Sequence, residues 1–244
     1  MHVVSEANLL RAYLKCATLV VEKGVRKSDM AEVQDLLCKV VLSPDDVHMF
    51  KCLVRDLESH PELVKGHQKA LRAYQRHFGS ITKPSYIGRL RGYPFLKPGT
   101  NDLSPVDQFE IVVNQFREAP QSSNLGMVLF HPNDIRDAFR PGYVPCLSFI
   151  DIKFRGGSLS TKFYFRSCDF AEVALFDFYH CLNIHGEIAS MFAKARPGVT
   201  IAQESILWNF SRAFTYNRRR KPIEIIRMAA SDILSDDVDG YAQI

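Results

Sequence analysis

The stretch that decides the fold runs from Val144 to Asp177 and reads V-P-C-L-S-F-I-D-I-K-F-R-G-G-S-L-S-T-K-F-Y-F-R-S-C-D-F-A-E-V-A-L-F-D. Apolar and polar residues alternate on both sides of a Gly-Gly turn, a pattern typical of a β-hairpin with one buried face. Cys146 opens the first strand of this hairpin and Arg166 follows the second, so we expect the two side chains to share one pocket. A guanidinium beside a thiol favours the thiolate and lowers its pKa from about 8.5. The stretch therefore predicts a reactive cysteine.

Composition alone favours a plainer interpretation of the same two residues. Cysteines in proteins are most often buried and inert. In that case Cys146 is a core residue and Arg166 is an unrelated surface cation.

The whole chain has the size of one ordinary globular domain. It has 244 residues, of which 46% are hydrophobic and 24% are charged, and such a chain can bury a substantial core without disulfides or metals. A formal net charge of +4 suits an anionic small molecule as well as nucleic acid. The basic run from Arg218 to Lys221 lacks the interleaved aromatic residues typical of nucleic-acid binding, so we do not expect a nucleic-acid partner.

The cysteines indicate a reducing compartment. None of the six forms a C-x-x-C pair, and no histidine cluster has the spacing of a zinc site, so no metal is expected. The first residues show no signal-peptide pattern, and apolar runs such as 17–21 are too short to cross a bilayer. We therefore expect a cytoplasmic protein that does not contact a membrane.

Apolar spacing divides the chain into a helical N-terminal segment over residues 1–80 and a catalytic core over residues 81–244. In the first segment the spacing favours helices over residues 9–21, 29–40, 44–57 and 61–74. Residues 81–106 are rich in Pro and Gly and are expected to form a long loop. The core is expected to contain helices over 106–118 and 172–194, a short helix after 131–134, and strands over 125–130, 146–154, 159–165, 200–216 and 222–227.

Several short motifs follow one another in an order that is more specific than any one of them. They are Tyr86-Ile-Gly-Arg-Leu-Arg-Gly-Tyr-Pro94, Val106-Asp107-Gln108, Val144-Pro145-Cys146, Phe165-Arg166-Ser167-Cys168-Asp169 and Phe176-Asp177. Together they resemble the Y-G-x-x-W-R-x-W-P, I-D-Q, P-P-C-H, Q-R-S-x-D and P-F-N motifs of the thymidylate synthase and pyrimidine hydroxymethylase family. The resemblance covers the middle of the chain and needs no gap between Cys146 and Asp177.

The resemblance implies an α+β fold, with a thymidylate-synthase-like mixed or antiparallel sheet covered by helices and a divergent helical N-terminal segment. The family is homodimeric through its sheet, so it also implies a homodimer. In the family's reaction, Cys146 would add to C6 of a pyrimidine, and the resulting carbanion at C5 would attack the methylene carbon of 5,10-methylenetetrahydrofolate. Arg166 would polarise the thiolate and contact a substrate phosphate.

The resemblance also assigns roles to the neighbouring residues. Ser167 would hydrogen-bond the same anion as Arg166, and Asp169 would face both the base and the folate. Tyr216 resembles the tyrosine of the family's H-x-Y-x-N ribose-binding motif, with Phe214 in place of the histidine.

Asp177 stands where thymidylate synthases have Asn. An amide offers a donor and an acceptor to uracil, whereas a carboxylate offers only acceptors and suits the amino group of cytosine. The family's cytidylate hydroxymethylases carry Asp at this place. The alternative is that Asp177 is a solvent-facing helix N-cap.

The phosphate-binding arginines of the family have no counterpart. The matching segment, Gln121-Ser122-Ser123-Asn124, contains no arginine. Losing two such contacts costs roughly 1.5–3 kcal/mol each in binding of a monophosphate. Arg218–Lys221 could substitute, or could be a solvated loop.

Taken together, the residues and the resemblance predict folate-dependent hydroxymethylation at C5 of a cytosine-type pyrimidine nucleotide or nucleoside, through a covalent adduct with Cys146. Two alternatives stay open. The first is an enzyme of the same fold that acts on a non-phosphorylated or non-pyrimidine ring. The second is a catalytically inactive family member that serves as a binding or partner subunit.

Overall fold

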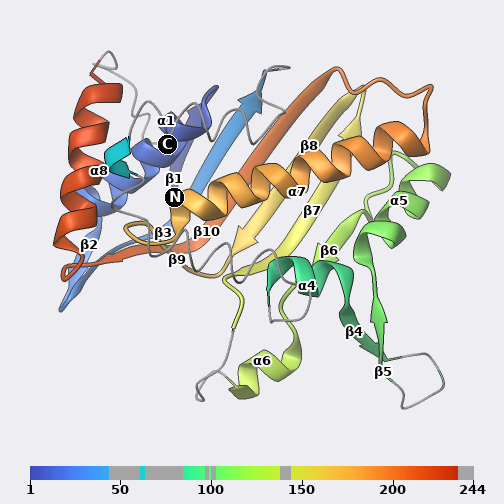
Figure 1. The fold of residues 1–244 in the computed structure, drawn as a ribbon, viewed down its shortest axis with the longest axis horizontal. Coiled ribbons are helices and arrows are strands. Elements are labelled where there is room, and N and C mark those ends of the chain that lie inside the picture. Colours follow the sequence, from blue (N-terminus) through green and yellow to red (C-terminus); the bar gives the residue numbers. More distant parts are fainter. Residues whose placement is uncertain (44–60, 64–84, 97–98, 100–102, 138–143, 236–244) are drawn as a thin grey trace.

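A computed structural model describes residues 1–43, 61–63, 85–96, 99, 103–137 and 144–235 of the chain. Its main feature is one mixed sheet in the order β1-β3-β10-β8-β7-β6 (Figure 1). In that order the strands are β1 (His2–Glu6), β3 (Met30–Leu42), β10 (Gln203–Tyr216), β8 (Ser158–Phe165), β7 (Leu147–Arg155) and β6 (Gly126–Val128). Two short strands extend it, β2 (Val25–Lys27) on β3 and β9 (Cys168–Asp169) on β10. The pairs β1–β3, β8–β10 and β9–β10 are parallel and the others are antiparallel.

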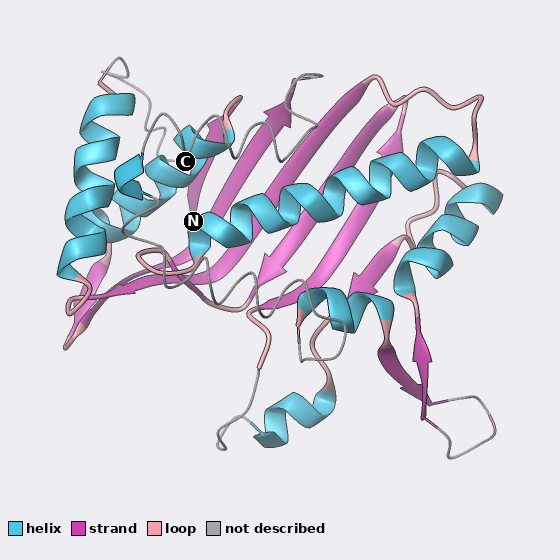
Figure 2. Cartoon of the chain, viewed as in Figure 1, coloured by secondary structure: helices cyan, strands magenta, loops and turns pink. Residues whose placement is uncertain are grey.

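The helices confirm the α+β class. The longest, α7 (Ala174–Ala195), crosses one face of the sheet (Figure 2). The others are α1 (Leu9–Thr18), which continues as the π-helix η1 (Leu19–Lys23), α4 (Tyr86–Arg91), α5 (Gln108–Glu118), α6 (Pro132–Asp137) and α8 (Arg220–Ile233). A separate hairpin is formed by β4 (Tyr93–Leu96) and β5 (Leu103–Val106).

The predicted hairpin over β7 and β8 is confirmed. Its two-residue turn is Gly156-Gly157, with φ angles of 55° and 80°. Two positive φ angles in succession match the right-handed twist of the strands and are tolerated at low cost by glycine. The predicted helices over 9–21, 106–118 and 172–194 and the strands over 125–130 and 200–216 are also confirmed, with shifted ends.

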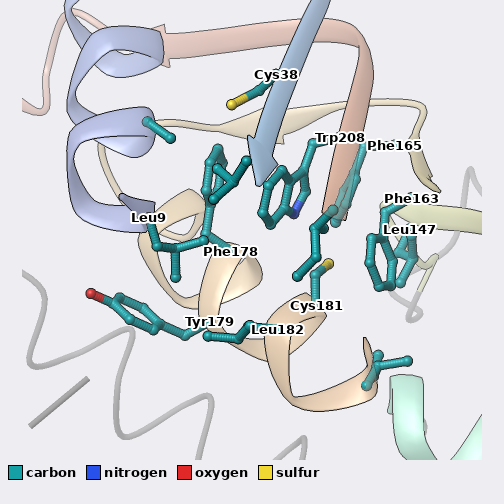
Figure 3. Close-up of a cluster of buried hydrophobic side chains, with 14 of the residues drawn as sticks. Leu9, Cys38, Leu147, Phe163, Phe165, Phe178, Tyr179, Cys181, Leu182 and Trp208 are labelled. Carbon is teal, nitrogen blue, oxygen red and sulfur yellow. The ribbon is translucent and has the colours of Figure 1, made fainter. Parts of the chain in front are cut away.

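The core lies between α7 and one face of the sheet. One row across four strands consists of Ile150, Phe163, Trp208 and Cys38, and every member is fully buried. Phe178 of α7 stacks on Trp208 with ring centroids 4.5 Å apart (Figure 3). Burying side chains of this size contributes roughly 1.5–3 kcal/mol each, so this layer holds α7 on the sheet.

The other face of the sheet is only half-buried. The row next to the core row consists of Val128, Phe149, Tyr164, Asn209 and Leu37, which point the opposite way because strand side chains alternate. Val128 is 41% exposed and Phe149 is 37% exposed. The sheet therefore presents a partly apolar outer face.

The predicted helix over residues 29–40 is wrong, because these residues form β3. The strand pairs with β1 along one edge and with β10 along the other. Asp35 has a φ of 53° and interrupts the alternation, so the buried residues change from Ala31 and Val33 to Leu36, Cys38, Val40 and Leu42. That break produced the three-residue spacing of apolar residues that resembles a helix.

Two other sequence predictions are wrong. Residues 222–227 form part of α8 instead of a strand, because Ile223, Ile226 and Ala230 share a helical face, and Pro222 lies in the first turn, where no N–H is needed. The described part of residues 81–106 is not a plain loop, since it contains α4, β4 and β5. The helices predicted over 44–57 and 61–74 lie largely outside the described residues.

Candidate active site

The segment that carries Cys146 is held by two hydrogen bonds and lies next to a bulge. The backbone N–H of Arg166 donates to the Cys146 carbonyl at 3.0 Å, which closes the hairpin at this end. The backbone N–H of Leu147 donates to the Tyr86 hydroxyl at 3.3 Å. A register shift between Leu147 and Phe149 bulges the strand next to the cysteine, and bulges of this kind often orient a side chain at a functional site.

The predicted neighbours of the Cys146 thiol lie beside it. The Ser167 hydroxyl donates to Cys146 Sγ at 3.9 Å. The Arg166 Nε donates to the Pro145 carbonyl at 3.3 Å, which places the guanidinium along the same segment. The structure therefore brings Cys146, Arg166 and Ser167 together as the sequence predicts.

The predicted lowering of the Cys146 pKa is wrong. Burial raises the pKa of Cys146, and the negative charge of Asp177 raises it further. The hydrogen bond from Ser167 and the charge of Arg166 act in the opposite direction but do not outweigh burial. Arg166 therefore lowers the pKa of the Cys146 thiol, as predicted, but burial has the larger effect.

Asp177 is a buried residue in the first turn of α7 and is not its N-cap. The N-cap position is Val173, and the Asp177 side chain is 4% exposed. Its Oδ2 accepts a hydrogen bond from Cys168 Sγ at 3.4 Å. Burial raises the pKa of Asp177 to about 7, so its carboxyl group is present in both protonation states near neutral pH. The N-cap alternative is therefore excluded.

Asp169 lies on β9, beside Phe214 of β10, and is also almost buried. Its Oδ1 accepts from the backbone N–H of Ala171 at 3.0 Å, and its own carbonyl accepts from Val173 at 3.0 Å. Burial raises the pKa of Asp169 to about 6, although nearby Arg219 lowers it. Asp169 thus connects the strand to the start of α7 and lies within electrostatic reach of Cys146.

Tyr216 lies apart from the thiol, at the end of β10. Its ring packs edge-on against Phe214 with centroids 5.4 Å apart, and the Arg218 guanidinium lies over it at 4.6 Å from the centroid. Arg219 forms an ion pair with Glu172. Two members of the basic run, Arg218 and Arg219, therefore have side-chain partners.

The motifs Tyr86–Pro94 and Val106–Gln108 mainly position the elements around the site. Arg89 of α4 makes a bidentate ion pair with Asp134, at 2.7 and 2.8 Å, and also donates to the Leu129 carbonyl. Gln108 bridges α4 and β6 through hydrogen bonds to the Arg89 carbonyl and to both backbone groups of Val128. These contacts position α4, from which the Tyr86 hydroxyl reaches the segment that carries Cys146.

Sequence reasoning missed the roles of Tyr86 and Cys168. Both stand inside motifs quoted above, but nothing in the spacing indicates that the Tyr86 hydroxyl would meet Leu147 or that the Cys168 thiol would meet Asp177. Burial raises the pKa of the Cys168 thiol strongly, so this cysteine acts as a neutral hydrogen-bond donor.

Across the described ranges, no group of three or more His, Cys, Asp or Glu side chains could hold a metal ion. The same part of the chain contains no helix that is long and apolar enough to cross a membrane.

The fold is of the α+β class, with one mixed sheet. Its site brings together a cysteine, an arginine and two buried carboxyl groups, and such a set of groups suits covalent addition chemistry. The family model for thymidylate synthase matches residues 53–225, which is most of the chain. The chain therefore belongs to the thymidylate synthase family. Comparison with curated protein sequences finds no significant match. Family membership supports one-carbon transfer from methylenetetrahydrofolate to a pyrimidine, and family members are typically homodimers.

The charge of Asp177 is expected to control the reactivity of Cys146. Asp177→Asn removes a negative charge that raises the pKa of the thiol, so alkylation of Cys146 by iodoacetamide should begin at lower pH. Arg166→Gln should shift the profile to higher pH. The measurement is the alkylation rate of the Cys146 peptide against pH, followed by mass spectrometry.

The matched control is Asp151→Asn, because Asp151 pairs with Lys153 at 2.8 Å on the outer face of the sheet and should not alter the profile. If the Asp177→Asn profile coincided with that of the unaltered chain, the electrostatic link between the two side chains would be disproved.

Proposed function

We propose that this protein catalyses folate-dependent hydroxymethylation at C5 of a cytosine-type pyrimidine nucleotide or nucleoside. The observation that carries the proposal is the buried carboxyl group of Asp177, which lies close enough to Cys146 to raise the pKa of its thiol. A base bound covalently at Cys146 would present its N3 and C4 substituents to a carboxyl group instead of an amide.

The chemistry begins at Cys146. Its sulfur forms a bond to C6 of the pyrimidine, and the electron pair of the C5–C6 double bond makes C5 nucleophilic. Because burial raises the pKa of the free thiol, the thiolate forms only when Arg166 and Ser167 stabilise it in the substrate complex. After C5 has gained the one-carbon unit, the C5 hydrogen leaves as a proton and the bond from the transferred carbon to its donor nitrogen breaks. Water then adds its hydroxyl to that carbon, and elimination of the Cys146 thiolate restores the C5–C6 double bond.

The residues present fit the folate that the family uses. When bound, methylenetetrahydrofolate supplies a one-carbon unit at the oxidation level of formaldehyde, and water supplies the hydroxyl of the product. Asp169 is the residue proposed to face it. Its carboxyl group accepts from the backbone N–H groups of Ala171 and Glu172, and the two oxygens of a carboxylate have further acceptor positions for the N–H groups of a pterin ring.

Asp177 provides the proposed selection for cytosine. When protonated, it donates to N3 of cytosine and accepts from the 4-amino group; when ionised, it accepts from the amino group and repels the O4 of uracil. A mismatched buried polar pair discriminates by orders of magnitude. Because the pKa of Asp177 is about 7, this selection should strengthen as the pH rises through 7.

The phosphate group would be bound differently from the family's arrangement. Arg218 and Arg219 are held beside Tyr216 and Glu172, and we propose that they replace the missing arginine pair, with Tyr216 against the sugar. The absence of arginine from Gln121–Asn124 favours one second candidate, a non-phosphorylated substrate at the same site.

A homodimer through the outer face of the sheet forms part of the proposal. That face carries the half-exposed side chains Val128, Phe149, Tyr164 and Leu37, and half-buried apolar rows of this kind mark protein interfaces. A cytoplasmic location is supported by the free thiols of the five cysteines within the described ranges.

The first expected result concerns hydrogen exchange at C5. In D₂O, the protein should exchange the C5 hydrogen of one of CMP, dCMP, cytidine or cytosine for deuterium without folate, because thiolate addition at C6 suffices. Proton NMR measures the loss of the C5 signal. Cys146→Ala should abolish exchange, whereas Cys181→Ala, which alters a fully buried thiol of α7, should retain it.

Exchange that survived in Cys146→Ala would show that another group is the nucleophile. Absence of exchange on every compound, dUMP included, would reject pyrimidine addition and favour the partner-subunit alternative.

The second expected result concerns the choice of base. The ratio of kcat/KM for dCMP over dUMP should rise between pH 6 and pH 8, and Asp177→Asn should reduce it by at least about tenfold and remove its pH dependence. Competition assays with both nucleotides at each pH measure the ratio. An Asp177→Asn enzyme with the unaltered preference would refute the role given to this carboxyl group.

The third expected result concerns the dimer. Phe149→Glu places a charge on the outer face of the sheet and should convert a dimer into a monomer, as measured by sedimentation equilibrium. Met228→Glu is the control, because Met228 is 68% exposed on α8, away from that face. A dimer that tolerates Phe149→Glu would exclude this face as its interface.

A further inference from the structure

A second site is suggested by a cavity that contains none of the residues assigned to the reaction. It has a volume of about 470 Å³ and lies between the β2–β3 hairpin, the end of β10 and the first turns of α8. Figure 1 shows these elements meeting where α8 begins, beside β2. The polar side chains that line it are Arg26, Arg220, Arg227, Glu224, Thr215 and Asn217.

The cavity carries an excess of positive charge. Arg220 and Arg227 of α8 are seven residues apart and therefore lie on one face of the helix, opposite Arg26 of β2. Within the described residues, none of these three guanidinium groups forms an ion pair. Glu224 is the single carboxylate among the lining residues, so the charges leave the cavity net positive.

The cavity lies on the opposite side of β10 from Tyr216, the residue proposed to contact the sugar. Thr215 pairs with Ala31, and Ala31 pairs with Arg26, so these three side chains share one face of the sheet. Tyr216 is next to Thr215 in the strand and points the other way. A ligand in the cavity therefore does not occupy the place proposed for the sugar.

Further hydrogen-bond donors face the same region. The helix α8 has no acidic residue in its first turn and no side-chain cap, so its dipole and the N–H groups of Arg220 and Lys221, the two residues before Pro222, favour an anion. Thr215 lines the cavity, is 1% exposed, and has a hydroxyl with no hydrogen-bond partner within the described residues. A buried hydroxyl without a partner is unfavourable, so a ligand that hydrogen-bonds to it is bound more tightly.

The arginine of the hairpin is held in place. The backbone N–H of Asn217 donates to the Asp29 carbonyl at 2.6 Å, and its side chain donates to the Ser28 carbonyl at 3.4 Å. These bonds fasten the β2–β3 turn, and with it Arg26, to the end of β10. The backbone that carries Arg26 is therefore fixed relative to the end of β10, which reduces the ordering cost of binding.

We propose that this cavity is a binding site for a small phosphorylated molecule. Arg26, Arg220 and Arg227 hold its phosphate groups, and Glu224 accepts a hydrogen bond from its hydroxyl or amino group. Arginine is suited to phosphate because its planar guanidinium can make two parallel hydrogen bonds. The volume lies within the usual range for small-molecule sites. The site is independent of the proposed reaction.

Inorganic pyrophosphate is the probe for this site, measured by isothermal titration calorimetry on the full chain carrying Arg166→Gln, Arg218→Gln and Arg219→Gln, so that the arginines assigned to the substrate phosphate are removed. One equivalent should bind. Arg220→Gln and Arg227→Gln should each weaken binding about tenfold or more, because each removes a charge-assisted contact. Arg117→Gln is the matched control, since Arg117 lies on α5 and contacts Asn114 at the surface.

Thr215→Val tests the floor of the cavity without changing its shape. It should weaken pyrophosphate binding while leaving the melting temperature unchanged or raised, since an unpartnered hydroxyl is replaced by a methyl group. A purely structural role would lower the melting temperature instead.

Three outcomes would overturn the proposal. Pyrophosphate that fails to saturate, or that is weakened as much by Arg117→Gln as by Arg227→Gln, would show non-specific attraction. Binding in the unaltered chain that is lost with Arg166→Gln and kept with Arg227→Gln would place the anion at the proposed catalytic site. Tighter binding of a single-stranded oligonucleotide, lost in the same arginine variants, would assign the surface to nucleic acid.

Discussion

The geometry of the candidate active site depends on one backbone hydrogen bond between the two strands of the β7–β8 hairpin, at the end away from the Gly-Gly turn. The Arg166 N–H donates to the Cys146 carbonyl, one residue beyond the pair Leu147 and Phe165. This backbone bond sets the register that places a thiol and a guanidinium 20 residues apart in sequence on neighbouring strands. Shifting the register by one residue would turn each side chain to the other face of the sheet. The bulge at Leu147 and the Tyr86 hydroxyl then fix the segment in the orientation seen here.

Burial dominates the electrostatics of this site. Asp177, Asp169, Cys146 and Cys168 all have raised pKa values, and desolvation is the largest cause in each. A buried carboxyl group with a pKa of about 7 can donate or accept a hydrogen bond near neutral pH, which a solvent-exposed aspartate does not do. The same burial favours the protonated form of the Cys146 thiol.

The strand β10 connects the two regions to which function is proposed here. It is paired along both edges, with β3 and β8, and its side chains alternate between the core face and the outer face. Tyr216 belongs to the proposed substrate site, and Thr215, the residue before it, belongs to the cavity beside α8. One strand thus supplies neighbouring residues to two separate sites because consecutive side chains point in opposite directions.

The sequence by itself determined the hairpin, the helices α5 and α7, and the grouping of Cys146, Arg166 and Ser167. These features follow from local alternation, the Gly-Gly turn and short motifs, and all of them act over neighbouring strands or within one helix. Only the tertiary structure decided that residues 30–42 form a strand, since Asp35 breaks their period and pairing with β1 and β10 stabilises the extended backbone. The pKa of the Cys146 thiol, the partner of Asp177 and the cluster of three arginines also required it, because burial and contacts between distant residues depend on how the whole chain packs.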